Sequence, residues 1–265
     1  KYIQRQILSR ILVQFPVSGC ARAYLRGVPL TANALPHTGK EKILKLDIDD
    51  FFGNITYISV YQHAFPGTLF PPAVRTLLTG LCCYDSILPQ GAPTSPYISN
   101  LVMVPFDETM DQWCRKRGIT YTRYCDDMTF SGSFNTGEVI SKTRFWLRRL
   151  GFELNDRKTR VITQSGRQEV TGLTVNQKAQ TPKFFRRSLR QEWYYIRKYG
   201  AADHLRRRLH TENITEEESR SYLLRLAGKI AYVLQANPEN PEFRAMQSEL
   251  QAMLRAPGTD VSGSS

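Results

Sequence analysis

Hydrophobic and polar positions follow two different periods in the first part of the chain. Apolar residues recur at helical spacing over residues 2–15, before Pro16, which predicts a first helix there. Over residues 42–48 the period changes to two, with apolar side chains on one face and charged ones on the other. This second segment is predicted to be a strand that carries Asp47 near its end.

A second strand pattern surrounds a pair of acidic residues. Residues 120–130 are rich in β-forming side chains on both sides of Asp126 and Asp127, which is typical of a hairpin with the acidic pair at its turn. Two apolar helical patterns, residues 93–104 and 141–150, separate and follow the strands. The order β, α, β, α, β, with no glycine-rich phosphate loop after a strand, predicts an α+β fold with helices on one side of the sheet.

Within residues 141–150, the spacing of Phe145, Trp146 and Leu150 predicts the apolar side of that helix.

The composition changes after Pro182. Residues 184–209 are rich in arginine and aromatic side chains, and residues 216–235 follow a second helical pattern. We therefore expect residues 1–181 to form a main domain, 182–255 a helical appendage, and the glycine- and serine-rich residues 256–265 a disordered tail.

The charge of the chain favours a phosphate-rich partner. It has 36 Lys and Arg against 24 Asp and Glu, a net charge of +12. Such an excess suits nucleic acid, because each neutralised phosphate releases counterions, although a basic surface also attracts anionic membranes. No apolar run approaches the roughly 18 residues that cross a bilayer, and the start lacks a secretion signal, so a cytoplasmic protein without membrane contact is expected. Five cysteines without metal-ligand spacing are expected to be buried thiols.

Acidic residues from distant parts of the sequence are predicted to meet at the end of the sheet. Asp47 ends one strand, and Asp126 and Asp127 lie at the hairpin turn. Carboxylate oxygens at one spot suit Mg²⁺, and a pair of such ions supports nucleotidyl transfer. The alternative for the acidic pair is a polar turn that favours aspartate for local reasons.

Four segments with this chemistry occur in a fixed order. They are Leu46–Phe52, Gln90–Pro96, Tyr124–Asp127 and Leu150–Asn155, the last followed by Lys158. In this order they resemble the palm motifs of reverse transcriptases. The resemblance covers roughly residues 1–250 and implies a right-hand polymerase, with palm and partial fingers interleaved in residues 1–181 and a helical thumb in residues 182–255.

The resemblance assigns catalytic roles to individual residues. Asp47 and Asp126 match the ligands of two Mg²⁺ ions, with the backbone carbonyl of Ile48 nearby and Asp127 completing the acidic group. Lys158 matches the family's proton donor to the departing pyrophosphate, and a solvated lysine is the alternative.

Three further residues match the nucleotide site of the family. Phe52 corresponds to the aromatic side chain that would clash with a ribose 2′-hydroxyl and so favours deoxynucleoside triphosphates; an ordinary core role suits Phe51 better. Gln90 and Gly91 correspond to the turn beneath the incoming nucleotide, and a simple helix-start turn is the alternative.

Two other segments are similar to signatures of bacterial retron reverse transcriptases. The first runs from Asn33 to His37, and the second consists of Val170, Thr171 and Gly172. That similarity implies a structured noncoding RNA as primer and template, a branched single-stranded DNA product, and a role in defence against phage with an effector protein as partner. For His37 a structural loop role is the alternative.

The residues expected to contact RNA come from these segments and from the basic run after Pro182. They are Asn33, His37, Val170, Thr171, Gly172, Arg186, Arg187 and Arg190.

The sequence departs from the family pattern at two places. Cys125 stands where alanine is common, a small-for-small change. The chain also begins inside a segment that normally follows a basic hairpin of the fingers, so the fingers are expected to be partial. A group II intron-type or other bacterial defence reverse transcriptase, or an inactive RNA-binding scaffold, remains the alternative function.

Overall fold

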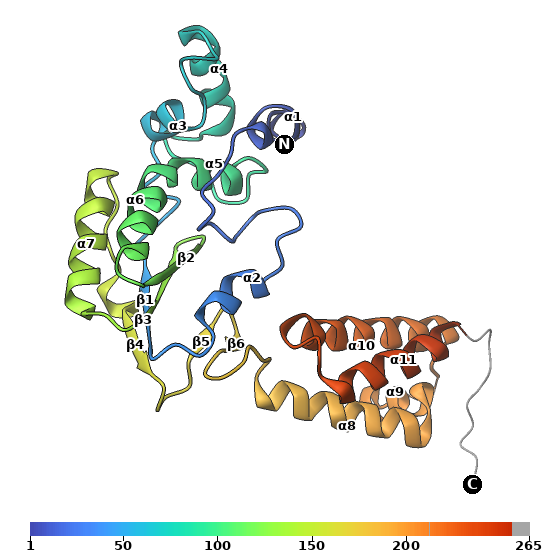
Figure 1. Ribbon diagram of the computed structural model, residues 1–265. Coiled ribbons are helices and arrows are strands. Elements are labelled where there is room, and N and C mark those ends of the chain that lie inside the picture. Colours follow the sequence, from blue (N-terminus) through green and yellow to red (C-terminus); the bar gives the residue numbers. More distant parts are fainter. Residues whose placement is uncertain (212, 256–265) are drawn as a thin grey trace. The chain divides into compact units, whose positions relative to one another are not determined.

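The computed structural model describes residues 1–211 and 213–255. The chain forms two compact units, residues 1–171 and the residues from 172 onward, and each has its own hydrophobic core. The first unit combines strands and helices, and helices dominate the second (Figure 1), which confirms the predicted α+β class. The tail 256–265, predicted to be disordered, lies outside the described residues.

An antiparallel four-stranded sheet is the framework of the first unit. Its strand order is β2-β3-β1-β4, so β1 lies inside the sheet between β3 and β4. Ile43 and Leu44 point to opposite faces of β1 and both are fully buried, because protein covers the two sides of this strand. The strands are β1 (Lys42–Asp47), β2 (Thr120–Tyr124), β3 (Asp127–Gly132) and β4 (Arg160–Thr163), with the short β5 (Glu169–Val170) at the end of the unit.

The helices of the first unit lie mainly alongside this sheet or toward one end of it. Figure 1 shows α6 and α7 alongside the sheet, and α1, α3, α4 and α5 gathered toward one end of it. The helices are α1 (Tyr2–Arg10), α2 (Thr31–Ala34), α3 (Tyr57–His63), α4 (Pro72–Cys82), α5 (Ser95–Val102), α6 (Val104–Arg115) and α7 (Thr136–Arg149). Three short 3₁₀ helices are η1 (Leu12–Gln14), η2 (Leu35–His37) and η3 (Asp156–Lys158).

Two sequence-based expectations about these helices were wrong in detail. The first helix ends at Arg10, and a 3₁₀ turn continues the apolar stripe. The apolar side of α7 was predicted only in part, because Trp146 and Leu150 pack against the core whereas Phe145 is 53% exposed, and Val139 and Leu147 are the fully buried residues. The helical spacing was read correctly, but it does not distinguish which of two apolar rows faces the core.

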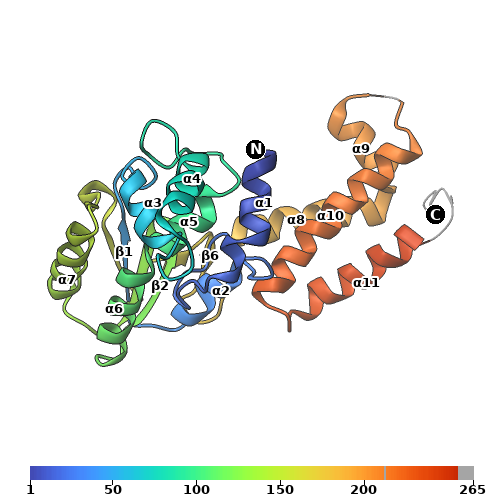
Figure 2. The ribbon, with the colours of Figure 1, turned by 90° about the horizontal axis from the view of Figure 1, so that it is seen from above.

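The second unit is helical. After the short strand β6 (Leu173–Thr174) it contains α8 (Lys183–Tyr199), α9 (Ala201–Leu209), α10 (Glu216–Ala236) and α11 (Pro241–Arg255). Figure 2 shows α10 and α11 running side by side, and α10 also packs against α8 and α9. The predicted helix over residues 216–235 is confirmed by α10. Its start is fixed by Thr215, whose side chain and Glu218 form a reciprocal capping box.

None of the described helices is both long enough and apolar enough to span a membrane. All five cysteines are free, and four of them are buried while Cys83 is half-buried, largely as expected.

Candidate active site

Two acidic residues lie opposite each other at the end of the sheet. Asp47 is the last residue of β1 and Asp127 the first of β3, and they are register partners in the antiparallel pair. Asp47 is only 6% exposed. Burial and the neighbouring carboxylates of Asp126 and Asp47 raise the pKa of Asp127, while Lys45 opposes this effect. Negative charge is therefore concentrated at this point of the fold.

Asp126 reaches the same place through a sharp turn. Cys125, between β2 and β3, has a φ of +61°, a left-handed conformation that costs energy for a residue with a side chain. The backbone N–H of Ile48 donates to the carbonyl of Asp126 at 3.2 Å and so ties the turn to the end of β1. The hairpin predicted over residues 120–130 thus forms, with Asp126 at its turn.

Lys158 lies against the first of these acids. Its Nζ is 2.9 Å from Asp47 Oδ1 and donates a hydrogen bond to Oδ2 at 3.1 Å. The hydrogen bond and the negative charge of Asp47 raise the pKa of Lys158, which keeps its ammonium protonated. The backbone N–H of Asn155 also donates to the Asp47 carbonyl at 2.9 Å, which anchors the Lys158 segment beside β1.

The chemistry of these groups fits a divalent cation in part. Asp47 Oδ1 is buried and faces the Lys158 ammonium at 2.9 Å, and the carboxylates of all three aspartates are hard oxygen ligands. Among residues 1–211 and 213–255, however, no three His, Cys, Asp or Glu side chains are arranged as a finished metal site. The backbone places the three aspartates at one end of the sheet, with Asp47 and Asp127 as register partners and Asp126 next to Asp127.

Phe51 and Phe52 differ in their exposure as the sequence suggested. Phe51 is a core residue, 4% exposed, whose ring contacts Phe152 at a centroid distance of 5.6 Å. Phe52 is half-buried and packs edge-to-face on Phe51 at 5.4 Å. The Phe52 ring, which follows the acidic end of β1, is therefore supported from behind and partly open to solvent.

Gln90 and Gly91 form an exposed turn that leads into α5. Gly91 has a φ of +79°, which favours glycine, and a side chain added there would meet no other atom within 4 Å. The hydroxyl of Ser95 donates to the carbonyl of Pro89 at 2.6 Å and fixes the turn. This geometry accommodates both interpretations of the segment, a helix-start turn and a backbone surface for a ligand.

The expected RNA contacts of the Asn33–His37 segment are not accessible. His37 is fully buried, with Nδ1 2.6 Å from the Ser131 hydroxyl and Nε2 2.8 Å from the Thr122 hydroxyl. Asn33 is 1% exposed. Burial lowers the pKa of His37 to about 3, so its ring is neutral at physiological pH. The structural alternative therefore describes His37, which joins η2 to β2 and β3 and presents no ring nitrogen to solvent.

The Val170–Gly172 segment is a tight turn. Val170 is fully buried, and Thr171 and Gly172 both have positive φ, +45° and +77°. Two consecutive left-handed residues are typical of a type I′ turn. The backbone of this turn, rather than the Val170 side chain, is the part that a ligand could reach.

The three arginines expected to contact RNA have different surroundings. Arg187 is exposed, and Arg186 is half-buried with its pKa lowered by burial. Arg190 forms a bidentate ion pair with Glu242 of α11 at 2.6 and 2.7 Å and lies over the ring of Phe243. Arg190 thus stabilises the packing of the helical unit, whereas the exposed Arg187 side chain is accessible to a ligand.

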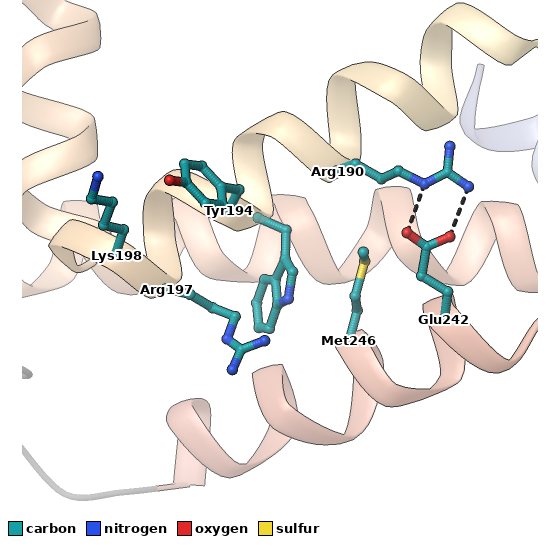
Figure 3. A pocket seen from close by; sticks show the side chains of 7 residues that line it. Arg190, Tyr194, Arg197, Lys198, Glu242 and Met246 are labelled. Carbon is teal, nitrogen blue, oxygen red and sulfur yellow. Dashed lines mark hydrogen bonds and ion pairs between the residues drawn. The ribbon is translucent and has the colours of Figure 1, made fainter.

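A groove of about 410 Å³ lies between α8 and α11. Figure 3 shows Arg190 crossing it to Glu242, with Tyr194, Arg197 and Lys198 further along α8. Trp193 and Met246 form its apolar part. Much of the positive charge along the groove is balanced within the helical unit, because Arg190 pairs with Glu242 and Arg197 lies 3.4 Å from Glu249.

A buried ion pair beneath the Asp126 turn was not predicted from the sequence. Arg123 and Asp107 are both fully buried, and Arg123 Nη2 lies 2.6 Å from Asp107 Oδ2. The alternation in β2 places Tyr121 and Arg123 on the same face of the strand, so burial of Arg123 could have been predicted from the sequence. Its partner Asp107 could not have been predicted, because the helix α6 that carries it was not expected from the sequence.

Comparison with known proteins places the chain in a family. The pattern that defines the family "Reverse transcriptase (RNA-dependent DNA polymerase)" matches residues 3–184, more than half of the chain. The chain therefore belongs to the reverse transcriptase family. The fold agrees, since a telomerase from Candida albicans, solved with a fragment of telomeric RNA, superposes with a TM-score of 0.51 at 9% identity. It covers 95% of this chain and 55% of the telomerase chain, and the α+β fold is that of a right-hand polymerase.

The similar curated proteins are retron reverse transcriptases. The retron Mx65 enzyme of Myxococcus xanthus is 33% identical over 261 residues, covering 91% of this chain and 57% of its own length. The retron Ec86 enzyme of Escherichia coli is 32% identical over 181 residues, covering 67% and 56% respectively. The resemblance to bacterial retron reverse transcriptases is thus confirmed. The chain spans slightly more than half the length of these two relatives.

Proposed function

We propose that this chain is the polymerase core of a retron-type reverse transcriptase. In this proposal it copies part of a structured noncoding RNA into branched single-stranded DNA from deoxynucleoside triphosphates in the bacterial cytoplasm. The observation that carries the proposal is the pairing of Asp47 with Asp127 across β1 and β3, with Asp126 at the adjoining turn and Lys158 on Asp47. The retron relatives support the choice of nucleic acid chemistry.

Asp47 and Asp126, with Asp127 and the Ile48 carbonyl beside them, would hold two Mg²⁺ ions. Those ions, when bound, lower the pKa of the attacking hydroxyl and stabilise charge on the pyrophosphate. Lys158, held protonated by Asp47, donates its proton to the departing pyrophosphate.

The nucleotide and RNA surfaces are assigned to other residues. Phe52 excludes a ribose 2′-hydroxyl, and the Gln90–Gly91 turn lies under the incoming nucleotide. Arg186 and Arg187 on α8 contact the RNA backbone, and the turn at Thr171 and Gly172 offers its backbone groups. Residues 1–181 act as palm and partial fingers, and residues 182–255 act as the helical thumb. An effector protein and a role in phage defence belong to the same proposal.

Primer extension with Mg²⁺ tests the catalytic assignment. We expect Asp126→Asn to lower nucleotide incorporation by on the order of 10³-fold, because several kcal/mol of charge stabilisation depend on that carboxylate. Asp85→Asn, at an exposed turn of the same unit, is the matched control and should leave the rate unchanged. Wild-type incorporation by Asp126→Asn would refute the proposal.

A second candidate, an inactive RNA-binding scaffold, is favoured by two observations. Lys158 already neutralises Asp47, and the described aspartates form no finished metal site. A scaffold would bind the noncoding RNA and incorporate no nucleotide. Sequencing of DNA joined covalently to copurified RNA distinguishes the two functions, because only the polymerase produces such a joint molecule.

A further inference from the structure

The buried guanidinium of Arg123 hydrogen-bonds to α6, to α5 and to the turn that carries Asp126. Arg123, on β2, is completely buried, as is Asp107 on α6. Arg123 Nε donates to Asp107 Oδ1 at 2.9 Å and Nη2 donates to Oδ2 at 2.6 Å, a bidentate pair. Nη1 points away from this pair, toward Asn100 Oδ1 at 3.3 Å and the carbonyl oxygen of Cys125 at 2.8 Å.

The bond to Cys125 acts on the peptide that carries Asp126. The carbonyl of Cys125 and the N–H of Asp126 belong to one planar unit, so fixing the carbonyl fixes the direction in which the chain enters Asp126. Cys125 has a φ of +61°, and such a conformation persists only where its surroundings enforce it. From the other side, Ile48 N–H donates to the Asp126 carbonyl. The turn is thus held at both ends of Asp126.

Stability alone does not require an arginine at this position. A buried ion pair costs much desolvation, and apolar side chains of similar volume often replace one without loss of stability. Burial by itself would lower the pKa of Arg123, but Asp107 raises it overall, so the charge is retained. An arginine is needed where one rigid, planar group must bind a carboxylate bidentately and still reach a third acceptor.

We propose that Arg123 is a positioning residue for nucleotide addition: its guanidinium, anchored on Asp107, orients the Cys125–Asp126 peptide and so places the Asp126 carboxylate relative to Asp47. This inference rests on the proposed function. It adds a residue that touches neither substrate nor metal, and it explains why a charged pair lies in the core under the hairpin.

Arg123→Lys tests the proposal, because an ammonium keeps the charge but cannot bind Asp107 bidentately and the Cys125 carbonyl together. We expect a folded protein whose kcat for nucleotide addition falls roughly 10- to 100-fold, while KM for the deoxynucleotide changes less than about 3-fold. The affinity for Mn²⁺, measured by electron paramagnetic resonance without substrate, should fall by about 10-fold.

Tyr121→Phe is the matched control. The Tyr121 hydroxyl is also buried and on the same strand, and its hydrogen bond at 2.8 Å goes to Asp107 Oδ1 rather than to the turn. We expect this variant to lower the melting temperature while kcat and Mn²⁺ affinity stay within about 3-fold of wild type. If it lost activity and Mn²⁺ affinity as Arg123→Lys does, the effect would be general core damage and the proposal would be wrong.

Two further outcomes complete the test. Wild-type kcat and Mn²⁺ affinity in folded Arg123→Lys would overturn the positioning role. If Arg123→Lys does not fold, the double variant Arg123→Met with Asp107→Leu removes the pair without leaving a charge and should show the same losses. Failure of both variants to fold would assign Arg123 to folding and reject the proposal. Mn²⁺ binding by a wild type that adds no nucleotide would instead count against the proposed function.

Discussion

The ammonium of Lys158 and the carboxylate of Asp47 form an ion pair although 111 positions separate the two residues. The pair forms because β1 ends at Asp47 and η3 ends at Lys158, and Asn155, just before η3, bonds to the Asp47 backbone. A lysine held in this way is charged and close to the acidic end of the sheet, which is what a proton donor for pyrophosphate requires.

Replacement of Lys158 should therefore slow chemistry more than binding. We expect Lys158→Met to lower the single-turnover rate at saturating deoxynucleotide by about 10²-fold or more, since a well-placed general acid contributes that much. Arg157→Met removes the exposed neighbouring cation and should have little effect. Equal rates for Lys158→Met and wild type in a rapid-quench experiment would show that Lys158 is only an ion-pair partner.

The different exposure of Phe51 and Phe52 predicts different consequences of truncation. Phe52→Val should reduce the preference for deoxynucleotides over ribonucleotides by roughly 10- to 100-fold, because the clash with a 2′-hydroxyl is removed. Phe51→Leu should instead lower stability by about 1 kcal/mol and leave the preference intact, since Phe51 is a core residue. Competition assays with paired nucleotides measure both ratios, and unchanged selectivity in Phe52→Val would exclude Phe52 as the gate.

Burial of His37 gives the free energy of unfolding a pH dependence. The pKa of this ring is about 3 in the fold, lowered by burial and by the charges of Lys40 and Arg22, against about 6.5 in an unfolded chain. Below pH 6.5 the unfolded state therefore binds one more proton. Stability is complete above that pH and falls by about 1.4 kcal/mol for each pH unit below it, down to about pH 3.

Urea unfolding between pH 5 and 7.5 measures this slope. His37→Gln retains hydrogen-bonding groups for Ser131 and Thr122 but does not titrate. Below pH 6.5 its free energy of unfolding should therefore change less steeply with pH than that of wild type, by about 1.4 kcal/mol per pH unit. Identical slopes in the two proteins would mean that His37 is accessible to water in the folded state.

Because Arg187 is exposed and Arg190 is paired with Glu242, their replacement should affect different properties: RNA affinity for Arg187 and thermal stability for Arg190. Arg187→Ala should weaken binding of structured RNA and reduce the slope of log affinity against log salt by about 1. Arg190→Ala should lower the melting temperature, because it breaks the bidentate pair with Glu242. Filter binding at several salt concentrations and thermal unfolding give the two measurements. Equal salt slopes for wild type and Arg187→Ala would remove Arg187 from the RNA surface.

The sequence predicted those parts of the site whose signals are local. The period of two in β1 and the β-forming residues around Asp126 are visible without any partner, and both elements formed as expected. His37 was misassigned because its hydroxyl partners, Ser131 and Thr122, come from strands far along the chain. The Arg123–Asp107 pair was missed for the same reason. Tertiary partners decide whether a polar residue faces solvent, and spacing alone does not contain them.

The central place of β1 in the sheet also determines which sequence changes the chain tolerates. Hydrogen bonds hold β1 to β3 on one edge and to β4 on the other, so a shift of β1 would disturb its pairing with both neighbours. Because side chains alternate, an extra residue within β1 would turn Asp47 to the opposite face and offer an aliphatic neighbour in its place. An extra residue in the loop after β3, at 133–135, would leave this alignment untouched. An inserted residue should therefore be tolerated in the loops just outside the strand ends and not inside the strands, whereas the effect of substitutions should change gradually along the chain.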